Sequence, residues 1–472
     1  NSYETSFKAS CLFHHIQDPH FCKLKSTVII NRKKLKYFTI AQKTSLTIFL
    51  LYKQKRHVIF LGMRKQPILY NANFTRYVMS QLFAFPSAWI YGSALMWVTL
   101  QITNSPLLLG VMGMCSSLPY LILTPVTGSM AERYDRRKLT LITNIINVVQ
   151  SSLLAFMAFT GLVNYPILAM FAIINGATGA IQEPARLAFL LDMVGPEHLI
   201  QANALSSVTF NIARILGPIV AGLLLTVHSG YCFALSALLL VPSIVMFTII
   251  DVKSTKIEPR GSMIVQFVEG AKYISRQKIP FLILFTIVLA STFGYGITIL
   301  SSAIASDVLK LGSIGYGLLQ SSVGVGALIG ALVISMTKSR QGIMAKFRSG
   351  SIMQAVMGLA LALVLLFYPT IWLAIPLYAI FGYMMVNQNV LASSILPMVT
   401  QEGYIGRVMG FYSFAVSGVM PIGNLIAGGL TQILTIPIGL LISYVALLIP
   451  TLIICVSPKA LNKDPFQNKI QS

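Results

Sequence analysis

Apolar stretches of about twenty residues recur along most of this chain, and they constrain its fold more than any other feature. Hydrophobic residues make up 55% of the 472 positions, and the mean hydropathy is +0.75. A soluble domain could not bury that much apolar surface, so a lipid bilayer must be the solvent. The pattern predicts an all-α integral membrane protein with twelve transmembrane helices. We expect them at 77–101, 106–127, 139–160, 164–184, 201–226, 230–250, 280–303, 315–337, 349–367, 371–396, 407–432 and 436–456.

The charges between the spans predict the orientation of the chain. Connections 128–138, 251–279 and 338–348 carry four, six and four Lys or Arg, whereas the connections on the other face contribute only Lys310. The positive-inside rule makes the basic face cytoplasmic, and an even number of spans then places both termini there. The formal charge of +22 is explained by topology, so we expect no nucleic-acid partner.

Residues 1–62 form a basic segment that contains no spanning stretch. They hold eleven Lys and Arg against two acidic residues, and the first methionine of the chain is Met63. We interpret Met63 as the natural start and residues 1–62 as either translated upstream sequence or an accessory extension. The segment also holds a cluster of zinc-ligand residue types without a second half-site, so we expect no metal site. Its members are Cys11, His14, His15, His20 and Cys22.

The spans divide into two halves that repeat in parallel. An offset of 203 residues places Pro218 on Pro421 and the basic connection 128–138 on 338–348. The order predicted is a six-helix bundle, a linker, a second six-helix bundle and a cytoplasmic tail, at 63–250, 251–279, 280–456 and 457–472. Part of the linker has helical apolar spacing, which predicts a helix on the membrane surface; a solvated linker is the alternative.

Several motifs resemble those of the major facilitator superfamily. Gly128-x-x-x-Glu132-Arg133-x-Asp135-Arg136-Arg137 resembles the signature loop between spans two and three. The segments Glu183-Pro-Ala-Arg186, Asn211-Ile-Ala-Arg214-Ile-Leu-Gly217-Pro218 and Arg407-Val-Met-Gly410 resemble the enterobactin-exporter-like, transmembrane secretion effector branch. The chain departs from these patterns at Glu132, where Asp is usual, and at Leu191, where Pro is common. The resemblance covers about 70–456 and implies two parallel-repeat six-helix bundles, transport rather than enzyme activity, and no cofactor.

The signature loop is a candidate conformational latch. A carboxylate at Glu132 can face a helix N-terminus of the other half, while Asp135 pairs with nearby arginines. Contacts that exist in only one arrangement of the halves would bias the equilibrium between inward- and outward-facing states. The alternative is a topology signal with solvated charges. The latch residues would be Gly128, Glu132, Arg133, Asp135, Arg136 and Arg137.

Among single residues, Arg214 is the strongest candidate for contact with a substrate. It falls near the middle of the fifth span, where a charge is costly and marks a cavity or pathway. A structural arginine bonded to carbonyls around the Pro218 kink is an equal alternative. Three consecutive amides in span ten cannot all face lipid, so part of that span must line a cavity. The cavity or interface set is Asn203, Ser207, Asn211, Arg214, Tyr295, Asn387 and Gln388.

A helix-bending motif resembles one associated with exporters of the superfamily. Small residues allow close helix contact, and proline bends a helix; the motif residues are Gly217, Pro218, Gly222 and Pro421. No phosphate-binding loop of the ATPase type is present. Proton coupling is therefore expected from the family, with Glu183 beside Arg186 as the candidate.

We therefore expect a monomeric, secondary-active exporter in the bacterial plasma (inner) membrane. Its substrate would be a small amphipathic or anionic molecule, siderophore-like or drug-like, moved by alternating access. Two alternatives stay open: a lysolipid or lipid flippase on the same fold, and a non-transporting membrane scaffold or sensor. An intact latch and a polar cavity argue against the scaffold.

Overall fold

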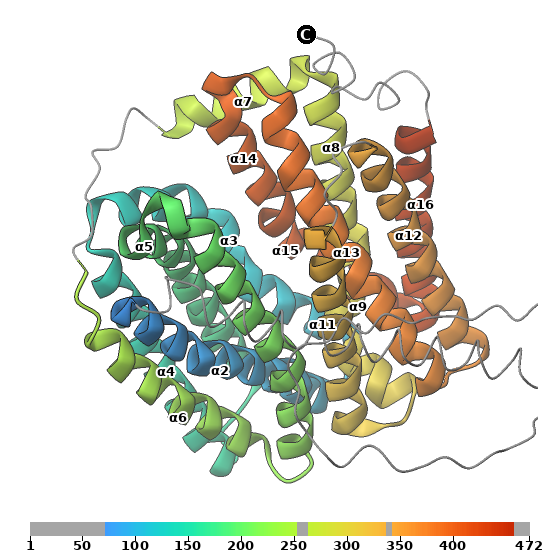
Figure 1. Ribbon diagram of the computed structural model, residues 1–472. Helices are drawn as coiled ribbons and strands as arrows, with labels where there is room; N and C mark the ends of the chain where they lie inside the picture. Colours follow the sequence, from blue (N-terminus) through green and yellow to red (C-terminus); the bar gives the residue numbers. More distant parts are fainter. Residues whose placement is uncertain (1–70, 253–262, 337–341, 457–472) are drawn as a thin grey trace, which may run out of the picture. The chain divides into compact units, whose positions relative to one another are not determined.

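A computed structural model describes residues 71–252, 263–336 and 342–456 (Figure 1), which belong to one compact unit spanning residues 68–472. The extension 1–62, with its Cys and His cluster, and the tail 457–472 lie outside the described residues. So does part of the linker. The predictions made for these segments stay predictions.

The structure confirms the expected all-α membrane fold, with twelve helices long and apolar enough to cross a bilayer and no strand among the described residues. The first half contains α2 (Ala72–Thr103), α3 (Pro106–Arg133), α4 (Arg136–Phe159), α5 (Tyr165–Leu225) and α6 (Ser229–Thr248). Helix α7 (Met263–Arg276) lies within the linker. The second half contains α8 (Lys278–Leu289), η2 (Ala290–Gly294), α9 (Gly296–Ile299), α10 (Ser301–Ala303), η3 (Ile304–Val308), α11 (Gly312–Met336), α12 (Ile343–Phe367), α13 (Ile371–Val399), η4 (Glu402–Tyr404), α14 (Ile405–Ser413), η5 (Phe414–Gly418), α15 (Met420–Ile433) and α16 (Ile436–Val456).

Spans four and five form the single long element α5, which is broken at Gly195. This glycine has φ 71° and ψ 170°, a left-handed conformation that residues with a β-carbon avoid. Pro196 follows, and its fixed φ suits the first turn of a new helix. The fourth span therefore stays helical about three turns beyond the predicted end at residue 184, and these turns are mostly apolar but carry Arg186 and Asp192.

Spans seven and eleven are interrupted by π-helical turns. In span seven, η2 ends immediately before Tyr295. In span eleven, η5 precedes Pro421, which lies in the first turn of α15. Proline has no N–H to continue an α-helical ladder, so a wider turn beside it is an expected local adjustment.

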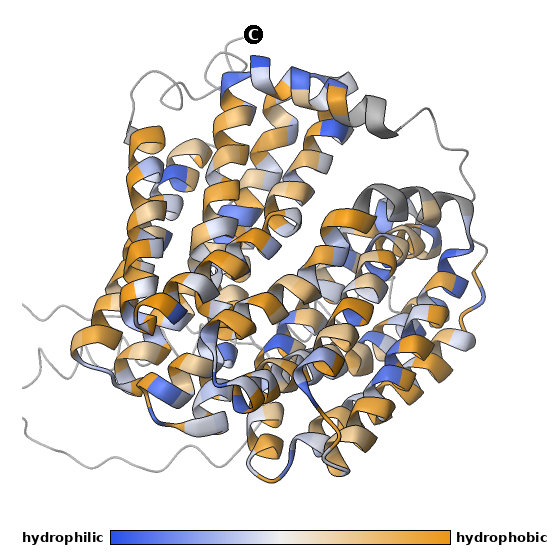
Figure 2. Ribbon diagram, turned by 180° about the vertical axis from the view of Figure 1, so that it is seen from behind, coloured by the Kyte–Doolittle hydropathy of each residue, from blue (hydrophilic) through white to orange (hydrophobic). Residues whose placement is uncertain are grey.

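Serine pairs help to hold the helices of the first half together. The hydroxyls of Ser80 and Ser243 are 2.8 Å apart, and those of Ser87 and Ser236 are also 2.8 Å apart; both pairs join α2 to α6. Small hydroxyl residues of this kind allow close packing and satisfy each other in the bilayer. Figure 2 shows hydrophobic residues along the length of most helices, as a lipid environment requires.

The two halves meet along two helix pairs, α3 with α15 and α5 with α11. Glycines make both approaches possible. A β-carbon built at Gly110 would lie 2.5 Å from the carbonyl oxygen of Asn424, and one at Gly317 would lie 2.5 Å from the carbonyl oxygen of Pro218. The 203-residue offset relates span two (α3) to span eight (α11), and span five (in α5) to span eleven (with α15). The two helix pairs are therefore equivalent under the internal repeat.

These contacts between the halves lie toward the short-loop face, opposite the basic connections. Gln432 accepts a hydrogen bond from the Ser105 hydroxyl at 2.7 Å near that face. At the same face, the hydroxyl of Ser313 donates to the Gly222 carbonyl at 2.9 Å, and further into the membrane the hydroxyl of Ser321 donates to the Ile215 carbonyl at 2.6 Å. The contacts thus run from the short-loop face to the level of Arg214.

We predict that Gly110→Ala destabilises this arrangement of the halves, because the added methyl group would overlap the backbone of α15. Gly92→Ala is the matched control in the neighbouring helix, since nothing lies within 4 Å of a β-carbon there. Thermal unfolding of the purified protein in detergent should show a lower midpoint for Gly110→Ala and an unchanged or higher one for Gly92→Ala. Equal midpoints for the two variants would contradict the close approach.

Candidate functional site

Arg214 of α5 lies between the halves and contacts a helix of each. Its guanidinium carbon is 5.5 Å from the centre of the Trp89 ring on α2, a cation–π distance. One of its terminal nitrogens is 3.9 Å from the sulfur of Met385 on α13, in the second half. The ion pairs among the described residues are Arg136–Asp192 and Arg407–Glu269, so Arg214 has no carboxylate partner there.

Asn389 and Tyr295 form a polar cluster on the second-half side of this site. The Asn389 amide nitrogen donates to the Tyr295 hydroxyl at 3.0 Å and to the Met385 carbonyl at 3.0 Å. The Tyr412 hydroxyl donates to the backbone carbonyl of Asn389 at 3.0 Å. Among the described residues, the amide oxygen of Asn389 has no hydrogen-bond partner, and it is buried.

The three consecutive amides of span ten point to three different places. Asn389 faces Tyr295. Gln388 is buried and donates to the Ser351 hydroxyl on α12 at 3.0 Å. Asn387 lines a groove formed by α11, α12 and α13. Successive residues of a helix are about 100° apart, so the central site receives Asn389, whereas Asn387 and Gln388 from the predicted set lie elsewhere.

The polar residues predicted along span five lie between Arg214 and the basic face. Asn211 donates to the Ser207 carbonyl at 2.8 Å, one turn back on the same helix. Ser207 is exposed and Asn203 is partly exposed. These three residues thus continue from Arg214 toward the basic face, on the part of α5 beyond the contacts with α11.

The predicted helix-bending residues serve close packing in this structure. A β-carbon at Gly217 would lie 2.5 Å from that of Trp89, and one at Gly222 would lie 2.7 Å from the Ser313 carbonyl oxygen. Helix α5 runs through Pro218 without a break. The motif therefore lets α5 approach α2 on one side and α11 on the other, which holds Arg214 and Trp89 together.

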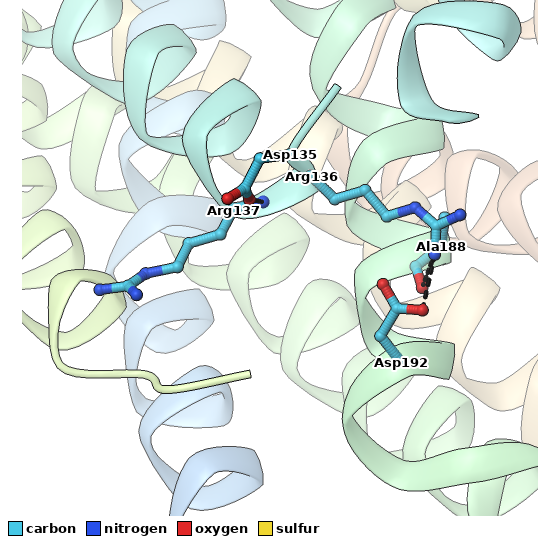
Figure 3. Close-up of polar contacts among 5 residues, drawn as sticks. All are labelled: Asp135, Arg136, Arg137, Ala188 and Asp192. Carbon is cyan, nitrogen blue, oxygen red and sulfur yellow. Dashed lines mark hydrogen bonds and ion pairs between the residues drawn. The ribbon is translucent and has the colours of Figure 1, made fainter. Parts of the chain in front are cut away.

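The signature loop connects helices of the first half (Figure 3). Asp135 caps α4 by accepting from the backbone N–H groups of Arg137 at 2.9 Å and Lys138 at 3.2 Å. Arg136 forms a 2.7 Å ion pair with Asp192 of α5, with both side chains 5% exposed, and also donates to the Ala188 carbonyl at 3.3 Å. Arg136 and Arg137 point in opposite directions. Arg137 donates to the Thr248 carbonyl at the end of α6.

The remaining latch residues are described only by their backbone. Gly128, Glu132 and Arg133 belong to helix α3, and their side chains lie outside the description. The contact of Arg136 with Asp192 joins α4 to α5 (Figure 3), and the contact of Arg137 with Thr248 joins α4 to α6. Both contacts lie within the first half. The contact of Glu132 with the other half therefore stays a prediction.

Residues 68–465 match the family model described as transmembrane secretion effector. The chain belongs to this family of major facilitator transporters. That membership confirms the resemblance drawn from the motifs, and it places the protein among transporters rather than enzymes.

Relatives of this chain include proteins named as a transporter, an efflux pump and an exporter. The staphyloferrin A transporter of Staphylococcus aureus is 25% identical over 263 residues, which are 55% of this chain and 66% of the relative. The multidrug efflux pump Tap of Mycolicibacterium fortuitum is 23% identical over 383 residues, 76% of this chain and 88% of the pump. The enterobactin exporter EntS of Shigella boydii is 24% identical over 327 residues, 66% of this chain and 73% of the exporter.

Solved transporter structures share the fold. A bacterial homologue of the iron transporter ferroportin in an inward-facing state aligns with a TM-score of 0.65 at 16% identity, covering 83% of this chain and 99% of that one. A bacterial homologue of the lysosomal transporter Spinster, also inward-facing, aligns with a TM-score of 0.60 at 12% identity, covering 85% and 99%. At these identities the likeness concerns the fold alone, and it confirms the predicted major facilitator architecture.

Glu183 and Arg186, which were predicted to take part in proton coupling, do not form an ion pair in the described part of the chain. Glu183 is exposed on α5. The guanidinium carbon of Arg186 lies 5.2 Å from the centre of the Phe85 ring on α2. Within the described ranges, both salt bridges involve other residues. The part of Glu183 in coupling stays a prediction.

Two partners in ion pairs were not predicted from the sequence. Asp192 lies beyond the predicted end of span four, so its position beside Arg136 could not be inferred. Glu269 of α7 pairs with Arg407 of α14 at 2.8 Å. Tyr273 of α7 stacks on Tyr404 with ring centres 4.2 Å apart. The linker helix α7 is therefore fixed to the end of span eleven in the second half.

We predict that Asp192→Asn destabilises the protein by about 3–5 kcal/mol, because it removes the carboxylate from a buried ion pair with Arg136. Glu197→Gln is the control, an exposed acidic residue of α5 just beyond the break at Gly195. Chemical denaturation in detergent would measure both. The double variant Arg136→Leu with Asp192→Leu should recover part of the loss. A double variant as unstable as the sum of its single variants would show that the two residues do not interact.

Proposed function

We propose that this protein is a secondary-active exporter of a small amphipathic or anionic molecule, siderophore-like or drug-like. The observation that carries the proposal is Arg214 between the two halves, which has no carboxylate partner among the described residues. The names of its relatives support export, since they include an enterobactin exporter and a multidrug efflux pump. This substrate class is our inference for this chain.

The surroundings of Arg214 suit an amphipathic anion. A charge near the middle of a membrane is costly unless a counter-charge or water accompanies it. The guanidinium has five donors and, in the part of the chain that the structure describes, no carboxylate partner, while Trp89 and Met385 provide apolar surface beside it. Asn389 adds an acceptor oxygen with no hydrogen-bond partner among the same residues. A ligand with an anionic group, an apolar body and a donor would satisfy all three features.

We propose that the arrangement corresponds to an inward-facing state in a bacterial plasma membrane. The basic connections favour a cytoplasmic location for the basic face and for both termini. Contacts between the halves run from the opposite face to Arg214. The substrate would then enter along the polar stripe Asn203, Ser207 and Asn211 from the cytoplasm. Rocking of the halves would release it on the other side.

The signature loop fits a latch in this scheme. The Arg136–Asp192 pair and the Asp135 cap fix the loop to the first half, which gives Glu132 a rigid base from which to reach the second half. We further propose protons as the coupling ion, with Glu183 as the titrating group. The family resemblance and the exposure of Glu183 support this choice.

We predict that Arg214→Gln lowers export at least about tenfold, because a neutral amide replaces the only cation proposed to contact the substrate. Arg214→Lys should keep part of the activity, since it preserves the charge without the planar donor set. The measurement is accumulation in inverted vesicles under an imposed proton gradient, screened over siderophores, drugs and lysolipids.

The control for this experiment is Arg276→Gln, which removes an exposed arginine at the end of α7. If the Arg214→Gln variant transports substrate as fast as this control does, Arg214 has no role in the transport mechanism. Gradient-dependent uptake of lysolipids alone would favour a flippase. Absence of any gradient-dependent flux in the unaltered protein would favour a scaffold or sensor.

We predict that Glu183→Gln abolishes accumulation driven by a proton gradient but leaves binding of the same substrate unchanged. A glutamine cannot release a proton, so substrate movement would no longer be linked to the gradient. Glu197→Gln is the control on the same helix. Vesicle uptake with and without a protonophore tests the prediction, and full gradient-driven uptake by Glu183→Gln would exclude this residue as the coupling group.

A further inference from the structure

A second site lies within the second half, away from Arg214. It is a half-open groove with a volume of about 560 Å³, bounded by α11, α12 and α13. Helices α11 and α12 both pack on α13, which forms the floor of the groove. The volume is within the range of small-molecule and cofactor sites.

The groove and the central site are on opposite sides of α13. Asn387 and Tyr383 line the groove, whereas Asn389 contacts Tyr295 and Met385 contacts Arg214. Residues 387 and 389 are two steps of about 100° apart on a helix, so they point in nearly opposite directions. The groove therefore opens on the outer flank of the second half and not between the halves.

Apolar side chains at the rim of the groove are exposed on this flank. Val333 of α11 is 44% exposed, Met353 of α12 is 42% exposed and Met398 of α13 is 37% exposed. Because these helices span a membrane, side chains on the outer flank face lipid rather than water. The occupant of the groove must therefore come from the bilayer.

The length of the groove matches one leaflet. Its lining on α13 extends from Met398, next to the basic end of the helix, to Tyr383. That is about 22 Å along the helix axis at about 1.5 Å per residue. A bilayer is about 40–45 Å thick with its headgroup regions, so about 22 Å from the basic face corresponds to one leaflet with its headgroups.

The charge on the groove lies at its basic end. Lys346 is exposed in the first turns of α12, at the basic face, and Ser349 lies beside it. Deeper in, the lining is mainly apolar, with Leu391 and Met384, and also includes the Asn387 amide. Gly350 leaves room in the groove, because nothing lies within 4 Å of a β-carbon built there. A cation at the headgroup level above a mainly apolar channel is complementary to an anionic lipid.

We propose that this groove binds an anionic phospholipid of the leaflet at the basic face. One acyl chain lies along α13 between α11 and α12, and the phosphate-bearing headgroup contacts Lys346. This site is separate from the proposed transport path and does not depend on which molecule is exported. Its lipid is a bound structural partner that packs against α11, the helix through which the second half contacts α5.

The test compares retention of phosphatidylglycerol and phosphatidylcholine with identical acyl chains by the full-length protein, using native mass spectrometry after delipidation and re-addition. The unaltered protein should retain phosphatidylglycerol preferentially. Lys346→Gln should reduce that preference about fivefold, the effect expected for one lysine near an anionic headgroup. Gly350→Leu should reduce retention of both lipids, because its side chain fills the groove while leucine favours the helix more than glycine does.

Lys278→Gln is the matched control, since it removes an exposed lysine at the basic end of another spanning helix of the same half. It should behave as the unaltered protein does. Equal retention of the two lipids by the unaltered protein would overturn the proposal, as would an unchanged preference in Lys346→Gln. Unchanged retention by Gly350→Leu would also overturn it. Export assays on the same variants are a separate readout, so a wrong export substrate would leave this test intact.

Discussion

The close approach of helix backbones across the two halves is the constraint on which the rest of the structure depends. In a bilayer, helices gain little from hiding apolar surface, so association relies on packing and on hydrogen bonds between helices. Glycines at positions 110, 222, 317 and 428 bring α3 to α15 and α5 to α11 within backbone contact. These approaches set the position of α5 between the halves. They also place Arg214 where side chains of α2 and α13 can both reach it.

Arg136 and Arg214, both in the first half, offset the cost of a charge in or near the membrane in different ways. Arg136 is buried at the basic face and neutralised by Asp192 at 2.7 Å, an arrangement that holds two helices in a fixed relation. Arg214 lies deeper and has an aromatic ring and a thioether in place of a carboxylate. The first arrangement suits a structural joint. The second leaves a charge that a bound anion would neutralise, and this is the basis of the transport role that we propose for Arg214.

The sequence was sufficient for much of the fold because its main determinants are local. Twelve apolar stretches predict twelve spans whatever their packing, and the match of the 203-residue offset to two equivalent helix pairs follows from the repeat. Span boundaries were less predictable. Gly195 and Pro196 end the fourth helix later than predicted, because the helix continues through Pro184, where the predicted span ended. Asp192 was missed as the partner of Arg136 for that reason.

The candidate site was only partly predictable. The cost of a mid-membrane charge identified Arg214, but the identity of its neighbours depends on which helices meet. Three adjacent amides of span ten are equivalent by composition, and only the rotation of α13 assigns Asn389 to the central cluster, Gln388 to α12 and Asn387 to the outer groove. By itself, the sequence determined the membrane environment, the number of spans and the family, since these follow from hydropathy and motif spacing. The tertiary structure decided which polar groups share a site, because contacts between distant helices depend on packing that no local pattern encodes.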